Sequence, residues 1–209
     1  MKNVKNFLKK AANADFLFMK LVMIIALHGA CQAEELRLLK VDNVEDSGRI
    51  LVSTLHDTKT RKNRIFTVTS ENGINGIELY RKYLNLRPKH VDHRRLFIYY
   101  KSGKCTVQPV GINTFYSIPK KIAVHLGLPE PNSFTGHCFW RTSATFLADS
   151  GAGIEILKRH GGWRSSGVAE AYVEDSIENK VKIRKDFLVI QLKGNLRPLH
   201  RQHRQYQQD

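Results

Sequence analysis

Side chains suited to chemistry as well as to packing are concentrated in one stretch, from Thr135 to Tyr172. Apolar residues in its first part recur at helical spacing and predict one helix, and a second, shorter helix is predicted over 154–160. A glycine-rich break at 150–153 and a His-Gly-Gly-Trp turn at 160–163 separate the segments. We therefore predict short helices that fold back on one another. Polar and aromatic side chains are expected at their ends, namely His137, Trp140, Arg141, Trp163 and Tyr172.

The composition suits one globular domain that binds a polyanion. The chain has 209 residues, 42% of them hydrophobic, which is enough for a buried core. Lysine and arginine number 34 against 19 aspartates and glutamates, giving a formal net charge of +15. Such an excess favours a nucleic-acid partner, although a basic protein without that role is an alternative. Cys31, Cys105 and Cys138 are expected to be free thiols in a reducing compartment. Neither His137 nor His160 completes a zinc-ligand spacing with them, so no metal site is predicted.

The N-terminal region imitates an export signal, because lysines precede an apolar run at 16–27 and small residues follow it. Asp15 and Lys20 interrupt the pattern, and the run is too short to span a bilayer. An amphipathic core helix with Lys20 at its rim explains the same residues. We therefore expect no membrane association, and a nuclear location in a eukaryote or a cytoplasmic one otherwise.

Taken in order, the chain predicts a mainly helical α+β domain with a small antiparallel three-stranded sheet. Helices are expected at about 14–29, 76–86, 113–126 and 177–190, a short one around Leu36, and strands at 50–55, 64–69 and 96–100. The expected division is a basic lead-in or linker at 1–14, the folded domain at 15–190 and a basic tail at 191–209. The tail is too poor in apolar residues to fold alone, so it is expected to be disordered.

Four cations surround the turn between the first two predicted strands: Lys59, Arg61, Lys62 and Arg64. A solvated turn explains any one of them. Four on one projecting loop of a basic protein suit phosphate contacts equally well.

The order and spacing of these residues resemble the tyrosine recombinase, or phage integrase, family. The second motif of that family reads His-x-x-Arg. Here His137 is followed three places later by Trp140, with Arg141 next to it. The third motif places a His or Trp nine residues before a tyrosine, and Trp163 and Tyr172 have that spacing.

The resemblance extends over about 15–190 and implies the fold of a recombinase catalytic domain. The first motif of the family, Arg-x-x-Glu-Leu, is matched at 32–36, with Gln32 where the family has arginine. Glu34 and Glu35 in this segment are expected to be a solvated pair rather than general acids. The catalytic lysine of the family lies in a β-hairpin turn, where this chain offers Lys59.

The reaction that the resemblance implies is attack of a tyrosine hydroxyl on a DNA phosphodiester, forming a 3′-phosphotyrosine and releasing a 5′-hydroxyl. Because the bond energy is retained, no cofactor or metal is required. The implied roles are Tyr172 as nucleophile, Lys59 as general acid, His137 as acid/base helper and Trp163 as indole donor to the phosphate. Taken singly, Tyr172 and Trp163 are also explained by packing.

Both arginine positions of the family hold other residues here, Gln32 and Trp140. A guanidinium is always charged and binds two phosphate oxygens at once, which an amide or an indole cannot do. Loss of one such donor costs about 3–4 kcal/mol, so loss of two is expected to lower the rate by several powers of ten. Arg141 is rotated by about 100° from Trp140 on a helix. It is expected to contact a backbone phosphate or a surface partner, with catalytic rescue as the alternative.

We therefore predict a degenerate, mobile-element-derived recombinase domain that binds double-stranded DNA but is impaired in strand cleavage. An active recombinase or transposon integrase is one alternative, and a non-catalytic protein-interaction domain is another. The segment after Tyr172 is expected to allow homo-oligomer contacts, and the length of the sequence is expected to leave no room for the N-terminal DNA-clamping domain that family members usually carry. The expected DNA contacts are Arg61, Lys62, Arg64, Arg141, Lys158, Arg159 and Arg164.

Overall fold

The computed structural model describes residues 2–56, 63–71 and 73–194, the side chains of residue 71 and of 186–194 excepted. The predicted general acid Lys59, the predicted DNA contacts Arg61 and Lys62, and most of the predicted tail at 191–209 lie outside the described residues.

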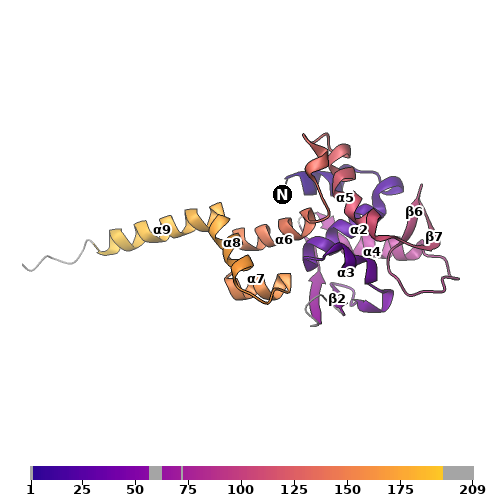
Figure 1. Ribbon diagram of the computed structural model, residues 1–209, viewed down its shortest axis with the longest axis horizontal. Coiled ribbons are helices and arrows are strands. Elements are labelled where there is room, and N and C mark those ends of the chain that lie inside the picture. The colour runs from indigo at the N-terminus through magenta and orange to yellow at the C-terminus, as the bar shows by residue number, and fades with distance from the viewer. Residues whose placement is uncertain (1, 57–62, 72, 195–209) are drawn as a thin grey trace, which may run out of the picture.

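Helices and short strands follow one another along the described chain. The helices are α1 Lys2–Lys10, α2 Asn13–Gly29, α3 Ala33–Leu38, α4 Gly76–Asn85, α5 Ile112–His125, α6 Cys138–Asp149, α7 Ile154–Gly161, α8 Gly167–Asp175 and α9 Ile177–Gly194. The strands are β1 Val44–Asp46, β2 Leu51–Leu55, β3 Arg64–Val68, β4 Ser70–Glu71, β5 Ile74–Asn75, β6 Ile98–Lys101 and β7 Lys104–Pro109. In Figure 1, α1–α5 and the strands form a body, α6–α8 lie beside it, and α9 projects away from both.

Helix α2 is the centre of the main core because it is apolar on nearly every side, as a helix surrounded by protein must be. Leu21, Val22 and Ile25 are fully buried, and α4, α6 and β3 pack around the helix. The expectation that Lys20 lies at the rim is wrong, since only 3% of the residue is exposed. Its Nζ donates to Asn13 Oδ1 at 2.9 Å, and burial, followed by the charge of Lys82, lowers its pKa.

The predicted three-stranded antiparallel sheet is present, but one of its strands was misassigned. Its order is β1-β2-β3, with Val44 paired to Ser53 and Ser53 paired to Phe66. The first strand, β1, lies within 41–49, where no strand was predicted. The predicted third strand is β6 instead, and it pairs with β7 in a separate two-stranded hairpin. The predicted fold class, mainly helical α+β, is confirmed.

Helix α1 packs on the same core as α2. Phe7 is fully buried and meets Phe16 edge to face, with ring centroids 5.6 Å apart. The predicted lead-in at 1–14 therefore contains a helix that contributes to the core. The predicted boundary at residue 190 falls within α9, and the division into three parts stays a prediction.

A second, smaller apolar cluster holds α6, α7 and α8 together. Its fully buried members are Ala148, Leu157 and Ala169, one from each helix. Since α6 also packs on α2 in the main core, this helix joins the two clusters. Among the helices of the described segments, none combines the length and the apolar character needed to cross a bilayer.

Candidate functional site

A basic cleft of about 1050 Å³ lies between the end of α2 with β3 on one side and α7 with its following turn on the other. Its basic side chains are His28, Arg64, Lys158, Arg159, His160 and Arg164, and Glu155 is the single acidic residue among the described residues that line it. The predicted DNA contacts Arg64, Lys158, Arg159 and Arg164 are thus brought together in one cleft. We refer to it below as the basic cleft.

The cleft wall formed by α7 depends on two consecutive glycines at the end of that helix. Leu157 is buried in the small cluster, so Lys158 and Arg159 occupy the last turn on the cleft side, where cations suit the helix dipole. A Cβ on Gly161 would lie 2.3 Å from the indole of Trp163, which folds back over this residue. Gly162 has a φ of 67°, in the left-handed region that favours glycine, and its N–H caps the helix at Lys158 O.

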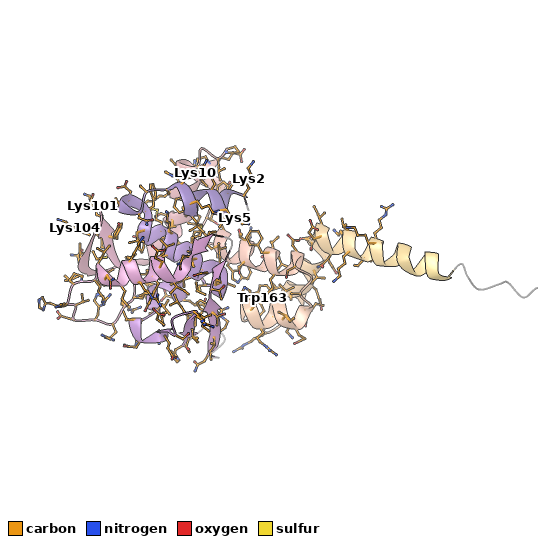
Figure 2. The ribbon with its side chains drawn as sticks, turned by 180° about the vertical axis from the view of Figure 1, so that it is seen from behind. Lys2, Lys5, Lys10, Lys101, Lys104 and Trp163 are labelled. Atoms are coloured by element: carbon orange, nitrogen blue, oxygen red, sulfur yellow. The ribbon has the colours of Figure 1, made fainter. Side chains whose placement is uncertain are left out.

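Three aromatic side chains from α6, α8 and the turn between α7 and α8 meet beside the cleft. The rings of Trp163 and Tyr172 are stacked, with centroids 5.6 Å apart and planes 6° from parallel. Trp140 meets both rings edge to face, at 5.3 Å from Trp163 and 6.0 Å from Tyr172. Trp163 also lines the basic cleft, and Figure 2 shows it where the α6–α8 unit meets the body. The residue at the second arginine position therefore lies against the predicted nucleophile as an aromatic ring.

The indole nitrogens of this cluster are enclosed. Nε1 of Trp140 and Nε1 of Trp163 are both buried, and neither has a hydrogen-bond partner within the part of the chain that the structure describes. A buried donor without a partner is costly. The cluster therefore contains two indole N–H groups that are available to an acceptor placed within hydrogen-bond distance of them.

The environment of Tyr172 opposes ionisation of its hydroxyl. Burial raises the pKa of Tyr172, and the charge of Arg141 lowers it by a smaller amount. Arg141 is exposed on α6 and is absent from the lining of the basic cleft. Its position one residue after Trp140 thus leaves it close enough to act on Tyr172 electrostatically, while Trp140 makes the ring contacts.

Arg64 is buried, which corrects its expected place among the cations of a projecting turn. The residue is 8% exposed. Its Nη2 forms an ion pair with Glu35 Oε2 at 2.8 Å, and its Nη1 donates to His160 O at 3.0 Å. Through these two contacts the guanidinium of Arg64 on β3 binds both α3 and the end of α7. Arg64 is therefore a structural link within the cleft wall rather than a free phosphate contact.

Glu35 also departs from its expected role in a solvated pair. Its side chain is only 11% exposed, and Oε2 accepts from Gln32 N at 2.8 Å as well as from Arg64. Glu34 does pair at the surface, with Arg37. Burial of Glu35 is possible because both the cation and the helix N-terminus compensate its charge.

The remaining predicted site residues lie around the cleft rather than in it. Gln32 precedes α3 and His137 precedes α6, and both are exposed. Neither lines the basic cleft. The sequence prediction that these two residues, Trp163 and Tyr172 act together stays a prediction, as does every catalytic role assigned to them.

One partly buried polar pair at the cleft was missed by sequence reasoning. His160 Nε2 lies 2.7 Å from Ser143 Oγ, and that hydroxyl donates to the carbonyl of Leu27. Burial, followed by the charges of Arg64 and His28, lowers the pKa of His160 to about 4. The imidazole is therefore neutral at ordinary pH and connects α7 to α6 and α2. Within the described residues, no three His, Cys, Asp or Glu side chains are grouped closely enough to hold a metal ion.

Comparison with known proteins assigns the family. A sequence model described as the phage integrase family matches residues 1–179. The chain belongs to the phage integrase family. The predicted resemblance is thereby confirmed. Among curated protein sequences, no significant match to this chain was found.

Solved structures share the fold of this phage integrase family chain at low sequence identity. A crystal structure of XerA recombinase aligns with a TM-score of 0.68 and 16% identity, covering 89% of this chain and 61% of that one. XerH recombinase bound to its difH substrate before cleavage aligns with a TM-score of 0.65, 17% identity and coverage of 89% and 51%. A lambda integrase dimer bound to a COC′ core site aligns with a TM-score of 0.55 and 14% identity, covering 83% of this chain and 56% of that one. The chain thus spans about half to three fifths of the lengths of these structures.

Proposed function

We propose that this chain binds duplex DNA in the basic cleft and is strongly impaired in cutting it. The observation that carries the proposal is the position of Trp140, whose ring packs against Tyr172 at the place where the family pattern has an arginine. Lys158, Arg159 and Arg164 keep the cleft cationic, so the charges that attract a phosphate backbone are retained. The charge that would stabilise the transition state is replaced.

The chemistry of the family explains why this replacement matters. The tyrosine oxygen must lose its proton as it bonds to phosphorus, the 5′-oxygen must gain one as it leaves, and the two non-bridging oxygens of the phosphorane carry negative charge. Burial raises the pKa of Tyr172, which disfavours the first step. An indole donates one hydrogen bond and carries no charge, so it stabilises those oxygens less than a guanidinium does. Binding needs no such transition-state charge and is expected to persist.

A covalent-adduct assay tests the cleavage part of the proposal. A nicked duplex that traps the 3′-phosphotyrosine is incubated with the protein, and denaturing electrophoresis detects any adduct. We expect no adduct above the level of Tyr172→Phe. The double variant Gln32→Arg with Trp140→Arg should gain adduct formation by about four powers of ten, because each restored donor contributes about 3 kcal/mol. Abundant adduct in the unmodified protein that disappears in Tyr172→Phe would refute impairment.

An active recombinase is the second candidate, and the effect of Arg141 on Tyr172 favours it. If Arg141 supplies the missing charge, Arg141→Gln should abolish any adduct formed by the unmodified protein, and Arg141→Lys should retain part of it. Thermal unfolding of both variants is the control, since an exposed side chain should leave stability within about 0.5 kcal/mol.

Binding itself separates a DNA-dependent role from a protein-interaction role. The affinity for a random duplex is measured between low and moderate salt, where each phosphate contact lowers log K by about 0.9 per decade of salt. We expect a slope near −3 or steeper from the cleft cations. Neutralising Lys158 and Arg159 to Gln should reduce its magnitude by about 2. Absence of duplex binding at low salt would favour the protein-interaction role.

Self-association through the C-terminal segment stays part of the proposal. Ile177 and Ile183 on α9 are 72% and 68% exposed, and α9 projects from the body in Figure 1. Replacing both with Ser should shift the protein towards monomer in light scattering if α9 contacts a second copy. An unchanged mass at high concentration would exclude a role for these two side chains.

A further inference from the structure

A second cationic surface lies on α1 and the β6–β7 hairpin, apart from the basic cleft. Its members are Lys2, Lys5, Lys9 and Lys10 of α1 with Lys101 and Lys104 of the hairpin, and we refer to them as the lysine face. In Figure 2, Lys101 and Lys104 lie at the end of the body far from α7 and α8, Lys2 and Lys5 lie on the side from which α6 emerges, and Lys10 lies between these two pairs; Trp163 lies apart from all five. No residue of the lysine face lines the basic cleft.

Helix α1 presents its lysines to solvent because its other side belongs to the core. Lys2, Lys5 and Lys9 are spaced three and four residues apart and therefore share one side of the helix. Phe7 and Leu8 lie on the opposite side and are buried. Since the apolar side is already covered by protein, the helix has no apolar face to insert into a membrane surface. The side chains of α1 that are accessible to a partner therefore include its lysines.

The hairpin is fixed so that its tip adds charge to the same surface. Gly103 N donates to Ala14 O at 2.8 Å, and the Tyr100 hydroxyl donates to Asn13 O at 2.6 Å. Both acceptors lie just after α1. The tip turns through Ser102 and Gly103, whose φ angles are 48° and 78°, and this places Lys101 and Lys104 at the two ends of the turn. Two segments about 90 residues apart in sequence thus form one rigid cationic surface.

Among the described side chains, the charges of the lysine face have no carboxylate paired with them. Several surface cations beyond it do pair with carboxylates, namely Arg37 with Glu34, Arg81 with Asp46, Lys82 with Glu78 and Arg94 with Asp42. Within the described residues, no lysine of the lysine face forms an ion pair. Asp15 is the carboxylate that acts electrostatically on Tyr100 beside the tip. One such carboxylate cannot balance six lysines.

The position of two of these lysines is unfavourable for the fold alone. Lys2 and Lys5 occupy the first half of α1, where the helix dipole favours anions, and α1 contains no acidic residue. Neighbouring cations also repel one another. A surface that keeps such charges without partners suits an extended polyanion with regularly spaced charges.

We propose that the lysine face is a second contact surface for the phosphate backbone of duplex DNA. It binds DNA outside the segment held in the basic cleft, so that a long duplex engages both surfaces and a short one engages the cleft. The inference rests on the proposed function for the identity of the polyanion. The lysines act as point charges on backbone phosphates, so the contact is independent of sequence.

Affinity measured against duplex length and salt tests this surface. The test variant carries Lys2→Gln, Lys10→Gln, Lys101→Gln and Lys104→Gln, all at exposed positions. The matched control carries Lys40→Gln and Lys89→Gln, exposed lysines outside both surfaces. Random duplexes of about 12 and about 45 base pairs, roughly 40 and 150 Å long, are titrated with each protein at several salt concentrations. Circular dichroism and thermal unfolding confirm that the variants fold, and the double variant Lys101→Gln with Lys104→Gln serves if the larger one does not.

The expected result is a loss confined to the long duplex. The salt slope of the test variant should fall in magnitude by about 3 to 4 with the long duplex, or by about 2 for the double variant, and should stay at the unmodified value with the short one. A test variant that matches the control at both lengths would overturn the inference. In that case the double variant Lys158→Gln with Arg159→Gln tests the basic cleft separately. If this variant loses affinity for the short duplex, the proposed function is still supported. Unchanged binding by that cleft variant, with loss at both lengths in the lysine variant, would move the proposed DNA site from the cleft to the lysine face.

Discussion

The buried ion pair between Arg64 and Glu35 gives the sharpest test of how the cleft wall is held together. The side chains are 9% and 11% exposed, and the N–O distance is 2.8 Å. Glu35→Gln keeps the size of the side chain and its hydrogen-bonding capacity but leaves the guanidinium without a counter-charge. Breaking a buried pair in this way costs about 3 to 5 kcal/mol. We expect about 3 kcal/mol here, because the carbonyl of His160 still accepts from Arg64.

Thermal and urea unfolding measure this loss. For a domain of this size, about 3 kcal/mol corresponds to a fall in Tm of roughly 6 to 12 °C. The matched control is Glu34→Gln, one residue away, whose exposed pair with Arg37 is worth about 0 to 1 kcal/mol. Because Arg64 bonds to the end of α7, amide exchange over 154–163 should also accelerate in Glu35→Gln. Equal losses in the two variants, below about 1 kcal/mol, would refute the view that this pair joins α3 to α7.

Two further predictions concern the same wall. Gly162→Ala should destabilise the fold by about 1 to 2 kcal/mol in urea unfolding, because φ is 67° and the new Cβ would lie 3.2 Å from Arg64 Nη1. The control is Gly167→Ala at the start of α8, where the Cβ has open space and alanine suits the helix, and it should not destabilise the fold. The folded-state pKa of His160, about 4, lies below its unfolded value near 6.5, so the unfolded chain binds the proton more readily. This contribution to stability is therefore complete above pH 6.5 and lost as the pH falls towards 4. The contribution is about 2 kcal/mol after allowance for the partial exposure of His160. The unfolding free energy of His160→Gln should therefore depend less on pH between 6.5 and 4 than that of the unmodified protein. Equal pH dependence in the two proteins would contradict the lowered pKa of His160.

The sequence predicted those helices and strands whose buried residues form a pattern within one continuous segment. The continuous apolar run at 16–27 predicted α2, since a helix enclosed by protein needs no polar side. Strand β2 alternates between buried and half-buried positions and β3 between buried and exposed ones, and both were predicted. Strand β1 was missed because it has three residues and only Val44 is buried, which is too short for an alternating pattern. The partner of β6 was assigned wrongly because strand pairing depends on the turn at 102–103 rather than on composition.

Long-range polar contacts were beyond the reach of the sequence. Arg64 and Glu35 are 29 residues apart, and each has the composition of an ordinary surface charge. Ser143 and His160 come from different helices, and nothing in either segment marks the pair. The family motifs, by contrast, indicated that Trp140, Trp163 and Tyr172 belong to one site, and the three rings are in contact. Motif spacing thus located the aromatic cluster, whereas the burial of the nearby charged residues could be seen only in the three-dimensional structure.

The aromatic cluster also explains how a chain could lose catalytic charge without losing this part of its fold. An arginine at position 140 would bring an unpaired charge beside Trp163 and Tyr172, near a small cluster whose fully buried residues are alanines and one leucine. The ring of Trp140 instead adds two edge-to-face contacts, each worth about 0.5 to 1.5 kcal/mol beyond its buried area. Under the proposed function, transition-state stabilisation is thereby exchanged for packing between α6 and α8. For the same reason, Trp140→Arg alone should lower stability even where it raises cleavage, and a variant that gains cleavage with no loss of Tm would show that the ring contacts contribute little.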